Sequence, residues 1–199
     1  MRAALQDARL GPHVNLVRNP RGTSTSFWTF QLGSGEPSML SGRSAMRVVT
    51  GGSNLAIQSI AGISAGSRVA WKATVAAAND GAVGRRLRGM TYSGVELPGT
   101  TSGVQTLGDI GQEIEIVCPA PVAAMPSASA SLYLVRIQGG SENQWVSGEG
   151  AVWVTDMIAV EVNQSGRVVE IPFFDGDTLG CRWLGTPNLS PSVGYPTMT

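Results

Sequence analysis

Hydrophobic and polar residues alternate with a period of two along several stretches of this chain. The clearest stretch is residues 68–77, in which every second position from Val69 is apolar and the intervening positions include Arg68, Lys72 and Thr74. The apolar side consists of Val69, Trp71, Ala73, Val75 and Ala77. A period of two is that of a β-strand with one buried face. Residues 113–118 alternate in the same way, so both stretches are predicted strands.

Other stretches extend this pattern to most of the chain between residues 15 and 162. Residues 132–135 are apolar on both faces, which favours a central strand. The longest predicted strand is 152–162, with Val152, Val154, Ile158, Val160 and Val162 in one register. Weaker strands are predicted at 26–32, 45–50, 54–60 and 85–92. Gly-, Ser-, Asn- and Pro-containing breaks separate these runs, which is typical of an all-β sandwich or barrel.

Composition supports this fold class and narrows the function. The 199 residues include 26 Gly and 11 Pro, whereas only 14% are charged. Many turns and few charges favour an all-β protein over a helical bundle. The net charge is zero, which argues against nucleic acid as the main partner. No segment has the apolar length of a membrane span or of a secretory signal. We therefore expect synthesis in the cytoplasm, no membrane insertion, and a surface suited to packing in an assembly.

The pattern divides the chain into three parts. Residues 1–13 are predicted to be an N-terminal arm, 14–163 the β-sandwich, and 164–199 a C-terminal appendix. The appendix contains the segment Phe-Phe-Asp-Gly-Asp-Thr at 173–178 and lacks the residue pairs of a reaction site. Its aromatic residues are the predicted assembly contacts, and they are Phe173, Phe174, Trp183 and Tyr195.

The order of elements resembles the jelly roll of carbohydrate-binding modules, one of the galactose-binding-like sandwiches. The resemblance rests on short motifs: Asn-Leu-Val-Arg-Asn-Pro at 15–20, Trp28, Ser-Gly at 41–42, residues 71–75 and the closing strand at 152–162. It implies a jelly-roll β-sandwich for about 150 residues.

The appendix and the opening Asn-Leu-Val-x-Asn-Pro segment resemble minor tail proteins of long-tailed phages that infect actinobacteria. The motifs are the 173–178 segment, Trp183, Gly-Thr-Pro at 185–187, Ser190 and Ser192. The resemblance implies a structural protein of the virion tail, not an enzyme, which assembles with copies of itself and with other tail proteins and contacts host cell-wall glycan. A free-standing carbohydrate-binding module or lectin is the alternative, and a cell-wall hydrolase a remote one.

A polar loop around Trp145 is the candidate sugar site. Glu142, Asn143 and Gln144 precede this indole, so the ring offers a stacking surface while the polar side chains bond sugar hydroxyls. The competing interpretation is that Trp145 packs on the edge of the sandwich or against another subunit.

Candidate metal ligands are few, and no cofactor is expected. Modules of the resembled type often hold structural calcium between the last-strand Asp and an acid after the Asn-Pro segment. Here Asp156 stands in the last strand, but residues 21–25 contain no acid. Asp156 shares parity with Val154 and Ile158, so it is predicted to point toward the core, where a carboxylate needs donors, an Arg or a cation.

Other chemistry-bearing residues have plainer interpretations. Asp175 and Asp177 are predicted to form a turn rather than a hydrolytic pair. The only histidine, His13, cannot by itself build a triad or a zinc site. The basic cluster Arg85, Arg86 and Arg88 is interpreted as a solvated or interface strand, since no global positive charge supports nucleic-acid binding. The sequence leaves open whether the two cysteines, Cys118 and Cys181, pair.

Overall fold

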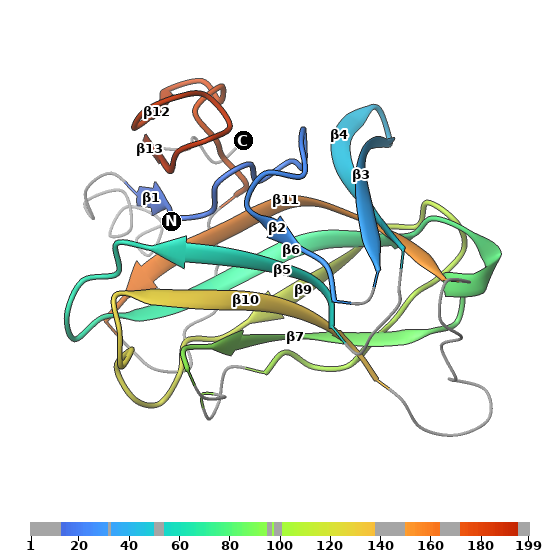
Figure 1. The fold of residues 1–199 in the computed structure, drawn as a ribbon, viewed down its shortest axis with the longest axis horizontal. Coiled ribbons are helices and arrows are strands. Elements are labelled where there is room, and N and C mark those ends of the chain that lie inside the picture. The colour runs from blue at the N-terminus through green and yellow to red at the C-terminus, as the bar shows by residue number, and fades with distance from the viewer. Residues whose placement is uncertain are drawn as a thin grey trace, which may run out of the picture.

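The computed structural model describes residues 13–31, 33–49, 54–94, 97, 101–137, 150–163 and 172–194 (Figure 1). Within these ranges there are thirteen strands and one short 3-10 helix, η1 (Asp80–Ala82), and no helix is long and apolar enough to cross a membrane. The strands are β1 (His13–Asn15), β2 (Trp28–Thr29), β3 (Ser34–Leu40), β4 (Arg43–Val49), β5 (Asn54–Ala61), β6 (Arg68–Ala77), β7 (Arg86–Tyr92), β8 (Gln105–Thr106), β9 (Ile114–Cys118), β10 (Ser129–Arg136), β11 (Ala151–Val162), β12 (Cys181–Trp183) and β13 (Ser192–Gly194).

Two five-stranded antiparallel sheets pack face to face. Sheet I has the order β2-β5-β10-β7-β8, and sheet II has the order β3-β4-β11-β6-β9. Figure 1 shows β5, β10 and β7 of sheet I in front of β6 and β9 of sheet II. The prediction of an all-β sandwich is therefore confirmed, and residues 132–135 do lie in the central strand of their sheet, β10.

The main core lies between the sheets and follows the predicted alternation. All five apolar residues of β6 named above belong to it, and Trp71 is its largest fully buried side chain. Ile116 and Cys118 of β9 face the same core. Leu132 and Leu134 of β10 close it from the side of sheet I. Because β6 and β9 are regular, a simple period of two predicted their buried faces correctly.

Strand β11 departs from that period, and the single register predicted for 152–162 is wrong. Its register against β6 shifts between Thr155 and Ile158, and Asp156 there has a φ of 51°. The residues facing the main core are Val152 and Val154 before this bulge and Met157 and Ala159 after it. Ile158 and Val160 consequently face the opposite side of sheet II, because a bulge adds one residue and inverts the alternation beyond it.

The bulge marks the point where β11 changes its hydrogen-bonded neighbour. Before it, residues 151–154 pair with β4. After it, the N-terminal segment takes over: the Ala159 carbonyl accepts from Leu16 N at 2.8 Å, and Met157 N donates to the Pro20 carbonyl at 3.1 Å. The chain from residue 16 to residue 20 thus occupies the position that β4 leaves.

Strands β3 and β2 also differ from the sequence-based prediction. β3 was not predicted, because Gly35 and Pro37 give its sequence the character of a turn. β3 is an edge strand, and an edge position tolerates a proline that cannot donate to the ladder. The strand predicted at 26–32 is reduced to the two residues of β2.

A third, three-stranded sheet of order β1-β13-β12 joins the two ends of the described chain. Figure 1 places β12 and β13 beside β1, next to β11. A second buried cluster holds this part to the outer face of sheet II, and its members are Ala70, Ala120, Ile158, Val160 and Phe174. The inverted alternation after the β11 bulge is what supplies Ile158 and Val160 to this cluster.

The two cysteines are both free thiols. Cys118 lies in the main core, whereas Cys181 packs against the outer-face cluster. Sheet II separates them, which answers the question that the sequence left open. Burial raises the pKa of both thiols, and the charge of Asp175 adds to this effect at Cys181.

Candidate functional site

The outer face of sheet I carries two outward-pointing aromatic side chains. Along β7, Leu87, Gly89 and Thr91 are buried, so the intervening side chains point outward. On β10, Tyr133 also points outward, since its neighbours Leu132 and Leu134 lie in the core. The outward residues of this central region are Met90, Tyr92 and Tyr133, which we call the tyrosine platform.

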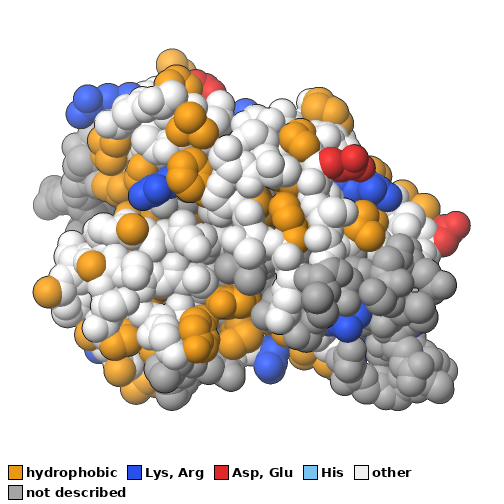
Figure 2. Space-filling model, in the orientation of Figure 1, with side chains coloured by type: hydrophobic (Ala, Val, Ile, Leu, Met, Phe, Trp, Pro, Cys, Tyr) orange, Lys and Arg blue, Asp and Glu red, His pale blue; other side chains and the backbone are white. Residues whose placement is uncertain are grey.

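The two tyrosines of the platform contact each other edge to face. Their ring centroids are 5.8 Å apart and the ring planes meet at 75°. Tyr133 pairs with Met90 across the β7–β10 ladder, and Tyr92 pairs with Ser131, so the tyrosines are diagonal neighbours. Tyr92 remains 37% exposed. Figure 2 shows hydrophobic side chains gathered over β10 and β7 on this face, with Lys or Arg side chains beside them.

Buried contacts fix the position of β7 beneath the platform. Thr91 Oγ1 accepts a hydrogen bond from Trp71 Nε1 at 3.0 Å across the core. Gly89 leaves no room for a larger residue beneath the platform. A Cβ atom at this position would lie 2.8 Å from the Trp71 ring and 2.4 Å from Cys118 Sγ. Ser102 also contacts Gly89, because its Oγ accepts a hydrogen bond from Gly89 N at 2.8 Å. The platform therefore stands on a well-packed strand.

Tyrosines that point outward from a well-packed sheet, one exposed and one half-buried, are suited to binding a ligand with both apolar and hydroxyl groups. Each ring offers an apolar face and one hydroxyl, and it loses little conformational entropy when it is covered. Small-molecule sites usually combine aromatic surface with a few polar groups. Sugar rings present C–H faces and hydroxyls, so they match this surface.

The sugar-site residues predicted from the sequence, Glu142, Asn143, Gln144 and Trp145, lie outside the described residues, and their role stays a prediction. The last described residue before them is Ile137, whose N–H donates to the Arg86 carbonyl at 2.9 Å. β10, the strand that precedes these residues in the sequence, belongs to the sheet that carries the tyrosine platform.

On the opposite side of the molecule, Asn15 joins three parts of the chain through its buried amide. Asn15 Oδ1 accepts from Val17 N at 3.1 Å and from Ala159 N at 3.0 Å. Its Nδ2 donates to the Met157 carbonyl at 3.1 Å and to the Phe174 carbonyl at 3.2 Å. Every donor and acceptor of this amide is used, with no exposed surface. Asn15 is thus a structural junction of the N-terminal segment, β11 and the appendix.

The second asparagine of the Asn-Leu-Val-Arg-Asn-Pro motif organises the loop that follows it. Asn19 Oδ1 accepts from Thr23 N and Thr23 Oγ1, both at 2.8 Å. Asn19 itself has a φ of 50°, a conformation that asparagine adopts more readily than most residues. Its carbonyl accepts from Trp28 Nε1 at 3.3 Å. The motif is explained by these structural contacts.

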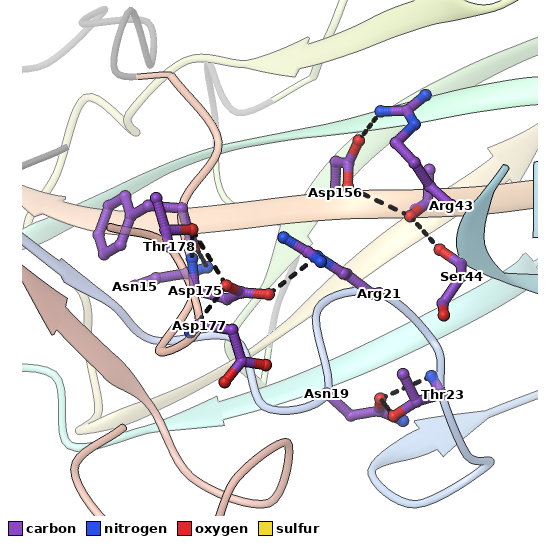
Figure 3. Close-up of polar contacts among 12 residues, drawn as sticks. Asn15, Asn19, Arg21, Thr23, Arg43, Ser44, Asp156, Asp175, Asp177 and Thr178 are labelled. Carbon is purple, nitrogen blue, oxygen red and sulfur yellow. Dashed lines mark hydrogen bonds and ion pairs between the residues drawn. The ribbon is translucent and has the colours of Figure 1, made fainter. Parts of the chain in front are cut away.

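Asp175 and Asp177 form a turn, as interpreted from the sequence. Asp175 is buried, and its Oδ1 accepts from Asp177 N at 3.1 Å and from Thr178 Oγ1 at 3.0 Å. Arg21 Nε lies 2.8 Å from Asp175 Oδ2, and the same guanidinium lies 5.1 Å from the Phe173 ring centroid. Figure 3 shows Arg21 between Asp175 and Asp156. These contacts give Asp175 a partner and leave it no exposed surface for hydrolysis.

The predicted assembly contacts fall into three groups. Phe174 is fully buried in the outer-face cluster, so it fastens the appendix to its own sandwich and has no surface to offer another chain. Phe173 and Trp183 are half-buried, and Trp183 Nε1 donates to Asp177 Oδ1 at 3.1 Å. Tyr195 lies outside the described residues. An intermolecular role for Phe173, Trp183 and Tyr195 stays a prediction.

Asp156 does not point into the main core, contrary to the prediction. The bulge turns it to the outer face of sheet II, where its carboxylate contacts Arg43 Nη1, and Arg43 Nη2 lies 2.6 Å from Glu113 Oε2. Desolvation raises the pKa of Asp156, an effect opposed by the charges of Arg43 and Arg21. Among the described residues, no three His, Cys, Asp or Glu side chains cluster as metal ligands. The partner of Asp156 is therefore a guanidinium, and the residues do not fit a calcium site.

The remaining singled-out residues are separated in space. His13 begins β1 and pairs with Gly194 of β13. Arg86 and Arg88 point outward from β7, beside the tyrosine platform, whereas Arg85 Nε donates to the Gly81 carbonyl at 3.3 Å. The basic cluster of the sequence is therefore split, and only two of its members share the face of the platform.

Comparison with known proteins identifies the fold. No protein-family model matches the sequence, and no curated protein matches it. The xylan-binding CBM22-1 domain of Paenibacillus barcinonensis Xyn10C superposes with a TM-score of 0.51 at 12% identity, covering 78% of this chain and 95% of that one. The chain has the fold of a carbohydrate-binding-module jelly roll. A second xylan-binding domain of CBM22 superposes with a TM-score of 0.50 at 10% identity, covering 76% of this chain and 97% of that one.

A phage protein is also similar, at a lower level. The enzymatically active domain of bacteriophage CBA120 tailspike protein 4 superposes with a TM-score of 0.44 at 13% identity, and the match covers 74% of this chain and 21% of that one. This likeness is too low to support a tail function. The jelly-roll prediction is confirmed by the comparisons with the binding modules, whereas the minor tail resemblance is not supported by them.

Proposed function

We propose that this protein binds carbohydrate on the tyrosine platform of sheet I. The observation that carries the proposal is the pair Tyr92–Tyr133, two aromatic rings in contact on the outer face of a well-packed sheet. The alternative function predicted from the sequence, a carbohydrate-binding module, is thereby preferred to the tail function. The similar folds named above are xylan-binding domains, which makes a glycan the first ligand class to test.

Replacing both tyrosines with alanine is expected to weaken glycan binding at least about 30-fold, since central aromatic residues of binding sites often contribute 2 kcal/mol or more. The test is a glycan microarray with the full chain, followed by calorimetric titration of the best oligosaccharide into the wild type and Y92A/Y133A. Neither ring belongs to the main core, so the variant should keep its thermal unfolding midpoint.

The matched control is Tyr92→Phe with Tyr133→Phe, which retains the rings and removes the hydroxyls. It should bind far better than the alanine variant. Equal binding by the wild type and the folded alanine variant would place the ligand elsewhere and contradict the proposal.

We propose as a second function that the protein is a structural component of a phage tail, with copies of itself and other tail proteins as partners and the virion as its location. The observation that favours assembly is apolar surface on the appendix. Leu179, Leu184 and Leu189 are 87%, 52% and 44% exposed. Exposed apolar residues concentrated on one segment are typical of contact surfaces.

Substituting serine for these three leucines should abolish self-association, because burial of their side chains would stabilise the contact. Sedimentation velocity over a wide concentration range measures this. The wild type is expected to form oligomers and the triple variant to remain monomeric. Val122→Ser, a similarly exposed position on the sandwich at 66%, is the control. A monomeric wild type would contradict self-assembly through this surface.

A further inference from the structure

The tyrosine platform continues along β7 into two outward-pointing arginines. Arg86, Arg88, Met90 and Tyr92 alternate with buried residues, so they form one row on the outer face of sheet I. Arg88 lies across the ladder from Val135, next to the Tyr133–Met90 pair. From Arg86 to Tyr92 the row extends for about 20 Å, at roughly 3.3 Å per residue. A sugar chain lying on the tyrosines therefore reaches the arginines.

Neither of these two arginines has an acidic partner among the described residues. Arg21, Arg43 and Arg47 each lie within ion-pair distance of a carboxylate. None of the ion pairs among the described residues involves Arg86 or Arg88.

Arg88 has, in addition, an unsatisfied donor. Its Nε is shielded from solvent and has no hydrogen-bond acceptor in the part of the chain that the structure describes. A shielded guanidinium N–H without an acceptor is costly. The row therefore combines aromatic surface with positive charge that no described carboxylate neutralises.

We propose that the glycan bound on the tyrosine platform is acidic, with carboxylate groups that Arg86 and Arg88 bind. This inference rests on the proposed carbohydrate-binding function and specifies its substrate class. A guanidinium matches a carboxylate in a planar, two-bond geometry, which makes uronic-acid residues the appropriate partners. The tyrosines bind the sugar rings, and the arginines select the charged members of the chain.

The experiment compares acidic and neutral oligosaccharides that share a backbone. The first pair is hexagalacturonate and its methyl ester, and the second is a glucuronic-acid-substituted xylohexaose and unsubstituted xylohexaose. A sulfated galactan oligosaccharide is the third probe. Calorimetric titration of the full chain at low and high salt gives each Kd. The carboxylate member of at least one pair should bind at least tenfold tighter, and this preference should decrease at high salt.

Variants separate the roles of the two residue types. R86Q/R88Q should remove the preference for the acidic member and leave the Kd of the neutral member unchanged, whereas Y92A/Y133A should weaken binding of both. Arg47→Gln, which removes a guanidinium from sheet II, is the control. Equal affinity for acidic and neutral members would overturn the inference and leave the proposed function standing. Binding of the sulfated probe alone would overturn the carboxylate assignment. Failure of all probes to bind would overturn the inference, whereas the proposed function would be overturned by the absence of any binding on the glycan microarray.

Discussion

Asn15→Asp is expected to lower the free energy of unfolding by about 4 kcal/mol, because it replaces two buried donors with acceptors. In the native chain, Asn15 Nδ2 donates to the carbonyls of Met157 and Phe174. An aspartate of the same shape would bring a carboxylate oxygen against these two carbonyls in a site without solvent. The Oδ1 contacts to Val17 N and Ala159 N would remain available. The loss of stability would therefore measure the contribution of the two Nδ2 hydrogen bonds alone.

Urea unfolding of the Asn15→Asp variant at several pH values measures this effect. The variant should be less destabilised in acid, where the introduced carboxyl is protonated and can donate one hydrogen bond. Asn163→Asp, the same change at an exposed asparagine, is the control and should alter stability by less than about 0.5 kcal/mol. Equal stability of the two variants would show that the Asn15 amide does not hold the junction.

Phe174→Ala is expected to have the second large effect. It should lower the free energy of detaching the appendix from the sandwich by about 3 kcal/mol. The ring is fully buried against Ile158 and Val160 of β11 and against two alanines, so its removal leaves a cavity. Because this cluster lies outside the main core, we expect β12 and β13 to open while the sandwich stays folded.

Amide hydrogen exchange measures this opening strand by strand. In Phe174→Ala, protection should fall sharply in β12 and β13 and remain in β6 and β10. Leu179→Ala removes an apolar side chain of the same segment that is 87% exposed, and it should leave the exchange pattern unchanged. If protection in β12 and β13 is the same in both variants, the outer-face cluster is not what fastens the appendix.

The parts of the fold that sequence reasoning predicted are those where alternation is unbroken. In β6 and β9, each inward position is apolar and each strand runs without a bulge, so the period of two located the main core. β11 could not be predicted in the same way. Its bulge depends on the exchange of β4 for residues 16–20 as hydrogen-bonded neighbour, which is a contact between distant segments. Beyond Asp156, the alternation therefore inverted against expectation.

The candidate site was missed for a related reason. The sequence places Tyr92 and Tyr133 in two predicted strands without assigning them to a face, and only the register of β7 against β10 makes them diagonal neighbours. The register depends on long-range contacts such as that between Trp71 and Thr91. The polar loop with Trp145 was easier to single out, because an aromatic residue among amides stands out in a local window.

The most direct test of the account is chemical-shift mapping of the full 20.7 kDa chain with the tightest-binding oligosaccharide of the microarray. The account predicts that the largest amide shift changes follow β7 and β10, from Arg86 to Tyr92 and around Tyr133. Shift changes confined to the outer face of sheet II or to residues 172–194 would contradict it.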